Sequence, residues 1–237
     1  MTKCFCLIFI IAAISATAFA QEQYLMPVDE GQSNPSLAAF RTKLIAAVKR
    51  KDAKYVLSVL DPKVKIDFGG GAGIVAFKKE WENLGPESRF WAQFLPVISN
   101  GGAFSDETEA KEPMFWAPYV FGSFPSELDA FEHAAIIGKD VHLRAKPSLK
   151  GDIVAKLSFN IVKIDPDELD VPDEGMSPAE MAYTGRNPEP FFWVKVTTLG
   201  GKTGYVKDEY VRRPVDYRAG FEKKRGVWKL VAFIAGD

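Results

Sequence analysis

Six short segments with the length and apolar content of β-strands follow one another in the second half of the chain, and they limit the fold more than any other feature. They are His133–Gly138, Val141–Ala145, Asp152–Leu157, Phe159–Asp165, Phe191–Val196 and Thr203–Val211. Turn-forming residues separate them, as in hairpin-connected strands. A series of this kind is typical of a small all-β barrel. We therefore predict a barrel over 132–214, interrupted by an acidic, proline-rich loop at 166–190.

The chain before this series alternates helical and strand patterns. Asn34 and Pro35 are a helix start, with Asn as the N-cap and Pro at the first helical position. Apolar residues then recur at helical spacing. The elements predicted here are helices over 36–49, 53–60, 74–81 and 89–99, and strands over 64–68 and 114–121. The first domain is therefore predicted to be of the α+β class.

The last twenty residues predict a β-hairpin. Its arms are Arg218–Lys223 and Val227–Ile234, and Lys224, Arg225 and Gly226 form the turn. In the second arm, alternation places one set of apolar residues on one face, namely Trp228, Leu230, Ala232 and Ile234. Val231 and Phe233 fall on the other face. Because both faces are apolar, we expect this strand to lie inside a sheet.

The N-terminus has the pattern of a secretory signal. Lys3 precedes the apolar run Cys4–Ile14, and Ala18-Phe19-Ala20 is a cleavage site of the small-x-small type. We expect residues 1–20 to be removed, 21–34 to form a flexible tail, and the protein to be exported to the periplasm or the medium without a stable membrane span. Both cysteines precede the cleavage site, so neither a disulfide nor a thiol nucleophile is expected in the mature chain.

Charge and motif spacing argue against several functions. The formal net charge is −1 at pH 7, which is unlike the basic excess of nucleic-acid-binding surfaces. His133 and His142 lack the spacing of a zinc site, and Leu169 stands where a calcium loop needs its third acid. No Gly-x-Ser-x-Gly motif is present. We therefore predict no metal, no cofactor and no catalytic residue.

The strand series resembles the bacterial SH3 domain family. The similar residues are Val141-His-Leu-Arg144-Ala-Lys-Pro147-Ser148, Val154-Ala-Lys-Leu157, Trp193-Val-Lys-Val196 and Gly204-Tyr-Val206. The chain departs from the family where Ser158-Phe159-Asn160 replaces a glycine, and where the acidic insertion falls beside the family's groove. The resemblance implies that Trp193 and Tyr205 build the core and the groove edges. Arg144 is a binding candidate, although we predict that it mainly bonds carbonyls of the following turn.

The remaining residues are similar to the cone-shaped α+β domains of the nuclear transport factor 2-like superfamily. The similar residues are Val48–Asp52, Leu60-Asp-Pro62, Val64–Phe68, Gly73–Phe77 and Gly226–Leu230. The resemblance implies one domain made of 35–131 plus 215–237, with the barrel inserted. Trp116 and Tyr119, together with Trp81 and Trp91, are expected to pack in the core, and the alternative is that they line a pocket. The arrangement resembles exported bacterial proteins that contain an SH3 domain.

These resemblances favour a non-catalytic binding module, whose barrel recognises peptide or peptidoglycan. One alternative is a small periplasmic hydrolase or isomerase that uses a pocket of the first domain, with Asp67 or His133 as acid or base. An enclosed cavity beside either residue would favour this enzyme, and an interior filled with aromatic side chains would disfavour it. A second alternative is an assembly role, in which barrel edges dock another exported protein. The oligomeric state is left open.

Overall fold

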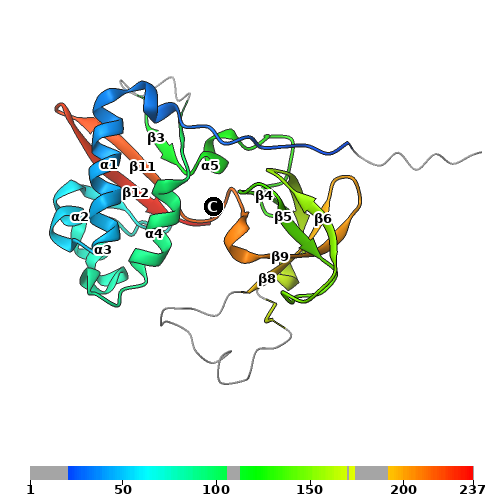
Figure 1. Ribbon diagram of the computed structural model, residues 1–237. Helices are drawn as coiled ribbons and strands as arrows, with labels where there is room; N and C mark the ends of the chain where they lie inside the picture. Colours follow the sequence, from blue (N-terminus) through cyan, green and yellow to red (C-terminus); the bar gives the residue numbers. More distant parts are fainter. Residues whose placement is uncertain (1–20, 106–112, 170, 174–191, 237) are drawn as a thin grey trace, which may run out of the picture.

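The chain folds into two units, each built around one β-sheet, and its class is α+β (Figure 1). The computed structural model describes residues 21–105, 113–169, 171–173 and 192–236. The predicted signal peptide and most of the acidic loop, from 174 to 190, lie outside the described residues. Among the described residues, no helix has the length and apolar character needed to cross a membrane.

The first unit is a five-stranded sheet with helices on one face. The strand order is β1-β12-β11-β3-β2, and only the β1–β12 pair is parallel. The strands are β1 (Leu60–Lys65), β2 (Ala103–Phe104), β3 (Phe115–Ala117), β11 (Arg218–Lys224) and β12 (Val227–Ile234). The helices are α1 (Pro35–Lys49), α2 (Ala53–Val59), α3 (Ile74–Glu80), α4 (Phe90–Ser99) and α5 (Tyr119–Ser123). The C-terminal hairpin thus lies in the middle of this sheet.

Two side-chain caps set the helix starts. The side chain of Asn34 accepts a hydrogen bond from the Leu37 amide at 3.2 Å, and that of Asp52 accepts one from the Tyr55 amide at 3.0 Å. Each cap satisfies an amide that has no partner inside its helix. The first helix therefore begins where the sequence predicted.

The core of the first unit is aromatic. Trp81, Phe90 and Phe94 from the helices meet Phe233 of β12, and the ring centroids lie 4.7–5.8 Å apart along this cluster. All four side chains are buried. The space between the helices and the sheet is therefore filled with rings.

The face assignment predicted for β12 was wrong, because the hairpin contains a β-bulge. Gly220 pairs with Ala232, but the next residue, Phe221, pairs with Leu230, so Val231 is an extra residue. The bulge shifts the alternation by one position. Trp228, Leu230 and Phe233 consequently pack in the core, whereas Val231, Ala232 and Ile234 line the opposite face of the sheet.

Two predicted strands have other bounds than the sequence indicated. The strand β1 begins directly after α2 and ends at Lys65, which leaves Phe68 outside it and 53% exposed. The aromatic run 114–121 is divided by Pro118, which follows β3 and caps α5. Pro118 therefore marks neither an edge strand nor a bulge, because β3 lies between β11 and β2.

The second unit is a seven-stranded antiparallel sheet of order β10-β4-β7-β8-β9-β5-β6. Its strands are β4 (His133–Ile136), β5 (Val141–Arg144), β6 (Ile153–Leu157), β7 (Ile161–Ile164), β8 (Trp193–Thr198), β9 (Thr203–Lys207) and β10 (Val211–Arg212). The short 3-10 helices η3 (Pro166–Glu168) and η4 (Asp208–Tyr210) follow β7 and β9. The six predicted segments are therefore all strands, and η4 divides the last into two. Small aliphatic side chains form the core of this unit.

Residues 21–34 do not form the flexible tail that the sequence predicted. Leu25 is buried, and its amide donates to the Phe159 carbonyl of the second unit at 2.8 Å. Further along, the Glu30 amide donates to the Gly102 carbonyl of the first unit at 3.0 Å, next to the 3-10 helix η1 (Glu30–Ser33). We call residues 21–34 the strap, because this extended segment contacts both units (Figure 1).

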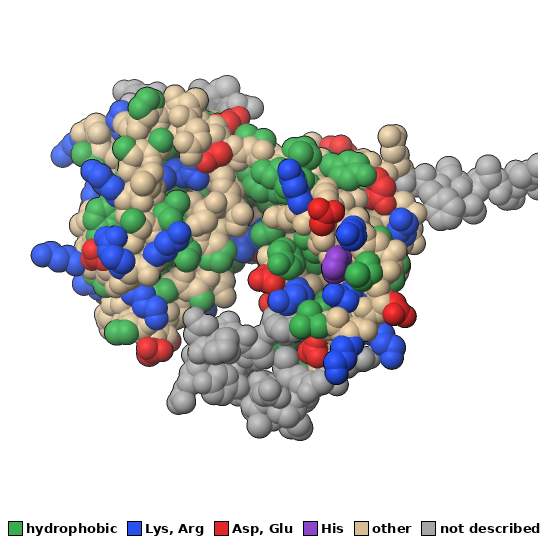
Figure 2. Space-filling model, in the orientation of Figure 1, with side chains coloured by type: hydrophobic (Ala, Val, Ile, Leu, Met, Phe, Trp, Pro, Cys, Tyr) green, Lys and Arg blue, Asp and Glu red, His purple; other side chains and the backbone are tan. Residues whose placement is uncertain are grey.

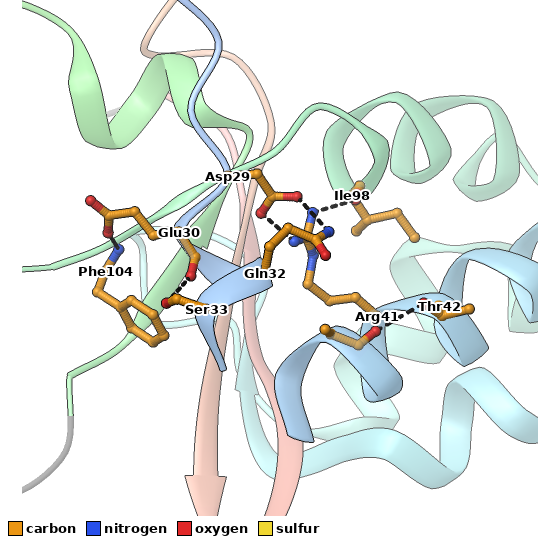
Figure 3. Close-up of polar contacts among 9 residues, drawn as sticks. Asp29, Glu30, Gln32, Ser33, Arg41, Thr42, Ile98 and Phe104 are labelled. Carbon is orange, nitrogen blue, oxygen red and sulfur yellow. Dashed lines mark hydrogen bonds and ion pairs between the residues drawn. The ribbon is translucent and has the colours of Figure 1, made fainter. Parts of the chain in front are cut away.

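The strap is fixed to the first unit by a buried ion pair (Figure 3). Arg41 of α1 is only 5% exposed, and its Nη1 lies 2.5 Å from Oδ1 of Asp29. Its Nη2 donates to the Ile98 carbonyl at 3.4 Å, and its guanidinium stacks on Phe115. Because a buried cation is costly without a partner, Asp29 holds the strap in place.

Candidate binding groove

A groove of about 370 Å³ lies on the second unit, where the β4–β5 turn, β5, the start of β8, the end of β9 and η4 meet. Figure 2 shows basic and hydrophobic side chains intermixed on the surface of this unit. The residues that line the groove are Lys139, Asp140, Val141, His142, Arg144, Leu149, Trp193, Lys207 and Tyr210. These residues come from distant parts of the chain and meet because β5 lies beside β9 in the sheet.

The groove combines a buried aromatic floor with an exposed apolar rim. Trp193 is 1% exposed, and its indole Nε1 donates to Oδ2 of Asp173 at 3.1 Å. Leu149 and Tyr210 are 55% and 38% exposed and stand at the rim. Exposed apolar side chains beside a hollow are a common feature of binding surfaces.

Positive charge dominates the groove. Lys139, Arg144 and Lys207 line it together with a single acid, Asp140. Lys207 forms an ion pair with Glu209 at 2.7 Å outside the lining set, and Lys139 lies on the surface turn before β5. The side chain of Lys139 is exposed, with its ammonium group 6.0 Å from the centre of the Phe159 ring, and that of Lys207 is 25% exposed.

Arg144 bonds the turn that follows β5, as the sequence predicted. Its Nη1 donates to the Gly151 carbonyl at 2.8 Å, across the turn between β5 and β6, and its Nη2 lies 3.2 Å from Nδ1 of His142. A side chain added at Gly204 would meet the Arg144 carbonyl at 2.5 Å, so β9 also needs a glycine beside this strand end. Arg144 therefore lines the groove while both of its Nη groups contact other residues of the fold.

Tyr205 does not line the groove. Its hydroxyl donates to Oε2 of Glu168 at 3.3 Å, and Lys195 holds Oε1 of the same carboxylate at 3.0 Å. Burial, and next the charge of Glu168, raise the pKa of Tyr205. This tyrosine belongs to a polar cluster that ties η3 to the sheet.

The structure does not bring together the four aromatic candidates of the first unit. Trp81 and Trp91 belong to its core. Trp116 lies on the opposite, open face of the sheet, beside a hollow of about 670 Å³, where its ring passes close over Gly220. Tyr119 is 2% exposed in a small cluster with Leu25, and burial raises its pKa to about 12.

The two residues of the enzyme alternative lie in open positions. Asp67 is exposed at the rim of the 670 Å³ hollow and accepts a hydrogen bond from the Gly71 amide at 2.7 Å. His133 begins β4, and its Nδ1 lies 3.0 Å from the Asp129 carbonyl. In the part of the chain that the structure describes, no group of three or more His, Cys, Asp or Glu side chains is placed to hold a metal ion.

Sequence reasoning named Arg144 and Trp193 as binding candidates and missed the other groove residues, among them Lys139, Leu149, Lys207 and Tyr210. They lie in turns or at strand ends, where hydrophobic periodicity gives no information. One local signal was available, because Asp140 has a positive φ of 52° and the Gly-Lys-Asp sequence before β5 indicates a tight turn. That signal places the turn but not its neighbours from β9 and η4.

Fold and site together define an α+β protein with two sheets and a basic, partly aromatic groove. In comparisons with known proteins, no family model, no curated protein and no solved structure matches this chain.

Proposed function

We propose that the chain is an exported, non-catalytic binding protein, and that its SH3-like second unit holds a peptide bearing carboxylates, with the peptide part of peptidoglycan as the ligand class. The observation that carries this proposal is the association of groove cations with the exposed side chains of Leu149 and Tyr210. Peptide ligands need both an apolar contact and a few placed polar groups. Export is supported by the signal pattern at 1–20.

Electrostatics favours an anionic ligand. Lys139 and Lys207 stand on the groove with Asp140 as the only acid among the lining residues, so the local field attracts carboxylates. Interactions of this exposed kind weaken as salt rises, because the Debye length falls from about 10 Å at 0.1 M to about 3 Å at 1 M. Binding should therefore be salt-sensitive, with a residual apolar part.

The lining residues favour binding over catalysis. They include no serine, threonine or cysteine, and His142 is turned to the Arg144 guanidinium. A serine, threonine or cysteine nucleophile beside a base is therefore missing from the described walls of the groove.

Sedimentation of the exported chain with purified peptidoglycan tests the proposal. We expect the wild type to sediment with it, and the double variant Lys139→Ala/Lys207→Ala to bind about tenfold more weakly, since each exposed ion pair contributes about 0.2–1 kcal/mol. Lys163→Ala is the control, because Lys163 is an exposed lysine of β7 that pairs with Glu132 outside the groove.

Blocking the carboxylates of the peptidoglycan chemically should weaken wild-type binding as much as the double variant does. Failure of the folded wild type to sediment, with a native circular dichroism spectrum, would refute the cell-wall ligand. Equal binding by the double variant and by Lys163→Ala would refute the groove as the binding site for peptidoglycan.

A second candidate function, an assembly role, is favoured by one observation on β6. This strand stands at an edge of the sheet, and its Ile153 and Val154 are 48% and 43% exposed. An apolar edge strand is a template for pairing with another chain. We expect Val154→Lys to abolish any self-association seen by analytical ultracentrifugation, and a monomeric wild type would exclude pairing between copies.

A further inference from the structure

A second cavity, of about 570 Å³, lies between the two units. Figure 2 shows the molecule hollowed between its two lobes, where the chain passes from β10 to β11 in Figure 1. Its walls come from α4, from the β10–β11 connection and from the C-terminal residues Ala235 and Gly236. We call this cavity the interlobe cleft, and it shares no lining residue with the groove.

Two of the four charged residues in the interlobe cleft neutralise each other. Nε of Arg213 donates to Oδ1 of Asp216 at 2.9 Å, and the Arg213 amide donates to Oδ2 of the same carboxylate at 2.9 Å. This bidentate pair closes the turn that follows β10. Arg213 and Asp216 therefore have little net charge to offer a ligand.

The other two charges, Arg212 and Asp208, are not satisfied in this way. Arg212 donates through Nη2 to the Tyr217 carbonyl, but its Nε is buried without a partner among the described residues. Oδ1 of Asp208 is likewise buried without a hydrogen-bond partner there. Among the described residues no ion pair joins the two side chains, and each keeps one buried atom without a hydrogen-bond partner. Asp216 near Arg212, and Lys207 near Asp208, offset only part of the two charges.

Burial makes both charges costly. It lowers the pKa of Arg212 and raises the pKa of Asp208, in each case because the charged form loses solvation. Buried polar atoms without partners are uncommon in folded proteins, and they destabilise the folded state. A ligand that interacts with both residues would recover this free energy.

The rest of the cleft is largely apolar. Side chains from both units contribute, and they are Phe131, Leu169, Val194, Val211, Val215 and Tyr217. A volume of 570 Å³ lies within the range of about 300–1,000 Å³ that small-molecule sites occupy.

We propose that the interlobe cleft binds a small zwitterion, an amino acid or short peptide with an apolar side chain, whose carboxylate is held by Arg212 and whose ammonium group is held by Asp208. A simple anion would leave Asp208 unpaired, and a simple cation would leave Arg212 unpaired. A ligand that carries both charges and an apolar side chain complements the two polar positions and the apolar walls of the cleft.

Ligand binding in this cleft should also hold the two units together. Gln93 and Tyr217 belong to the first unit, and Val194 and Val211 to the second, so the ligand contacts both. A ligand that binds only the folded state raises stability by about 2.7 kcal/mol at a hundredfold excess over its dissociation constant. The melting temperature of the whole chain therefore reports occupancy.

The test uses leucine, the dipeptide alanyl-leucine and the N-acetylated form of each as probes, with calorimetry and thermal denaturation of the full exported chain. We expect at least one free zwitterion to bind and to raise the melting temperature, and its N-acetyl form to bind at least about tenfold more weakly, because the ammonium group is lost. Asp208→Asn should bind the free and N-acetyl forms equally, since this variant keeps the side-chain shape but removes the charge.

Lys139→Ala, which alters the groove only, is the control and should keep the preference for the free zwitterion. Arg212→Gln should lose both probes, and circular dichroism checks that it still folds without its bond to Tyr217. The proposal is overturned if no probe binds the wild type at about 10 mM, or if the N-acetyl forms bind the wild type as well as the free forms do. Because different variants alter the cleft and the groove, the proposal for one site can be refuted without refuting the proposal for the other.

Discussion

The two units fill their interiors with side chains of different kinds. In the first, the rings of Trp81, Phe90 and Phe233 pack against one another between the helices and the sheet. In the second, the core consists of alanine, valine, isoleucine and leucine, and its buried tryptophan, Trp193, reaches a surface groove. The candidate sites therefore lie where loops converge on the second unit and between the units.

The largest expected effect distinguishes the two cores. Phe233→Ala should lower the free energy of unfolding by about 3–5 kcal/mol, because its ring contacts at least four others in the first unit. Val206→Ala in the second unit should cost about 2 kcal/mol. Urea denaturation measures both, with the 85% exposed Val75→Ala as control. Equal losses at the two buried sites would contradict this difference between the cores.

The next effect concerns the strap, which connects the units. Asp29→Ala leaves the guanidinium of Arg41 buried without its carboxylate, and should cost about 2–4 kcal/mol. Gln32→Ala is the matched control, because Gln32 only adds an exposed hydrogen bond to the same carboxylate (Figure 3). Thermal denaturation compares the two variants. If the two variants have the same melting temperature, the buried ion pair does not fix the strap.

The strap also shows where sequence reasoning stops. Helix starts, the strands of the second unit and the hairpin are local, since caps, alternation and turn residues specify them within a few positions. The strap has no periodicity, because Leu25 and Asp29 each bind a different unit. The bulge at Val231 is equally hidden, because it appears only when β12 pairs with β11. Of the site, Arg144 and Trp193 were predictable from family resemblance, whereas Lys139 and Tyr210 meet only through the strand order.

A smaller effect should separate structure from binding in the groove. Arg144→Ala removes the bonds to the Gly151 carbonyl and to His142, and should lower stability by about 1–2 kcal/mol. Affinity for peptidoglycan should change less than in Lys139→Ala/Lys207→Ala, because both Nη groups of Arg144 already contact other residues of the fold. Equal melting temperatures of Arg144→Ala and the wild type would refute the stabilising role of Arg144.

The smallest effect contrasts two carboxylates whose pKa values are shifted in opposite directions. Burial acts to raise the pKa of Asp61, but the ion pair with Lys224 at 2.9 Å and the Lys63 amide outweigh it, so the pKa is lowered from 3.8. The stability that Asp61 contributes is therefore present above about pH 4 and is lost as pH falls through the lowered pKa. For Asp208, burial raises the pKa above 3.8, so its contribution is favourable at low pH and is lost as pH rises through the raised pKa.

It follows that the two amide variants should change stability at pH 7 with opposite sign. Asp61→Asn should lower the melting temperature, since Lys224 loses its charged partner, whereas Asp208→Asn should raise it, since the amide is cheaper to bury than the carboxylate. Melting temperatures measured from pH 3 to pH 8 check both signs, and the two curves should approach the wild type at the acid end. A fall in stability for Asp208→Asn at pH 7 would mean that its carboxylate is already compensated within the fold, and the argument for an unpaired acid in the interlobe cleft would fail with it.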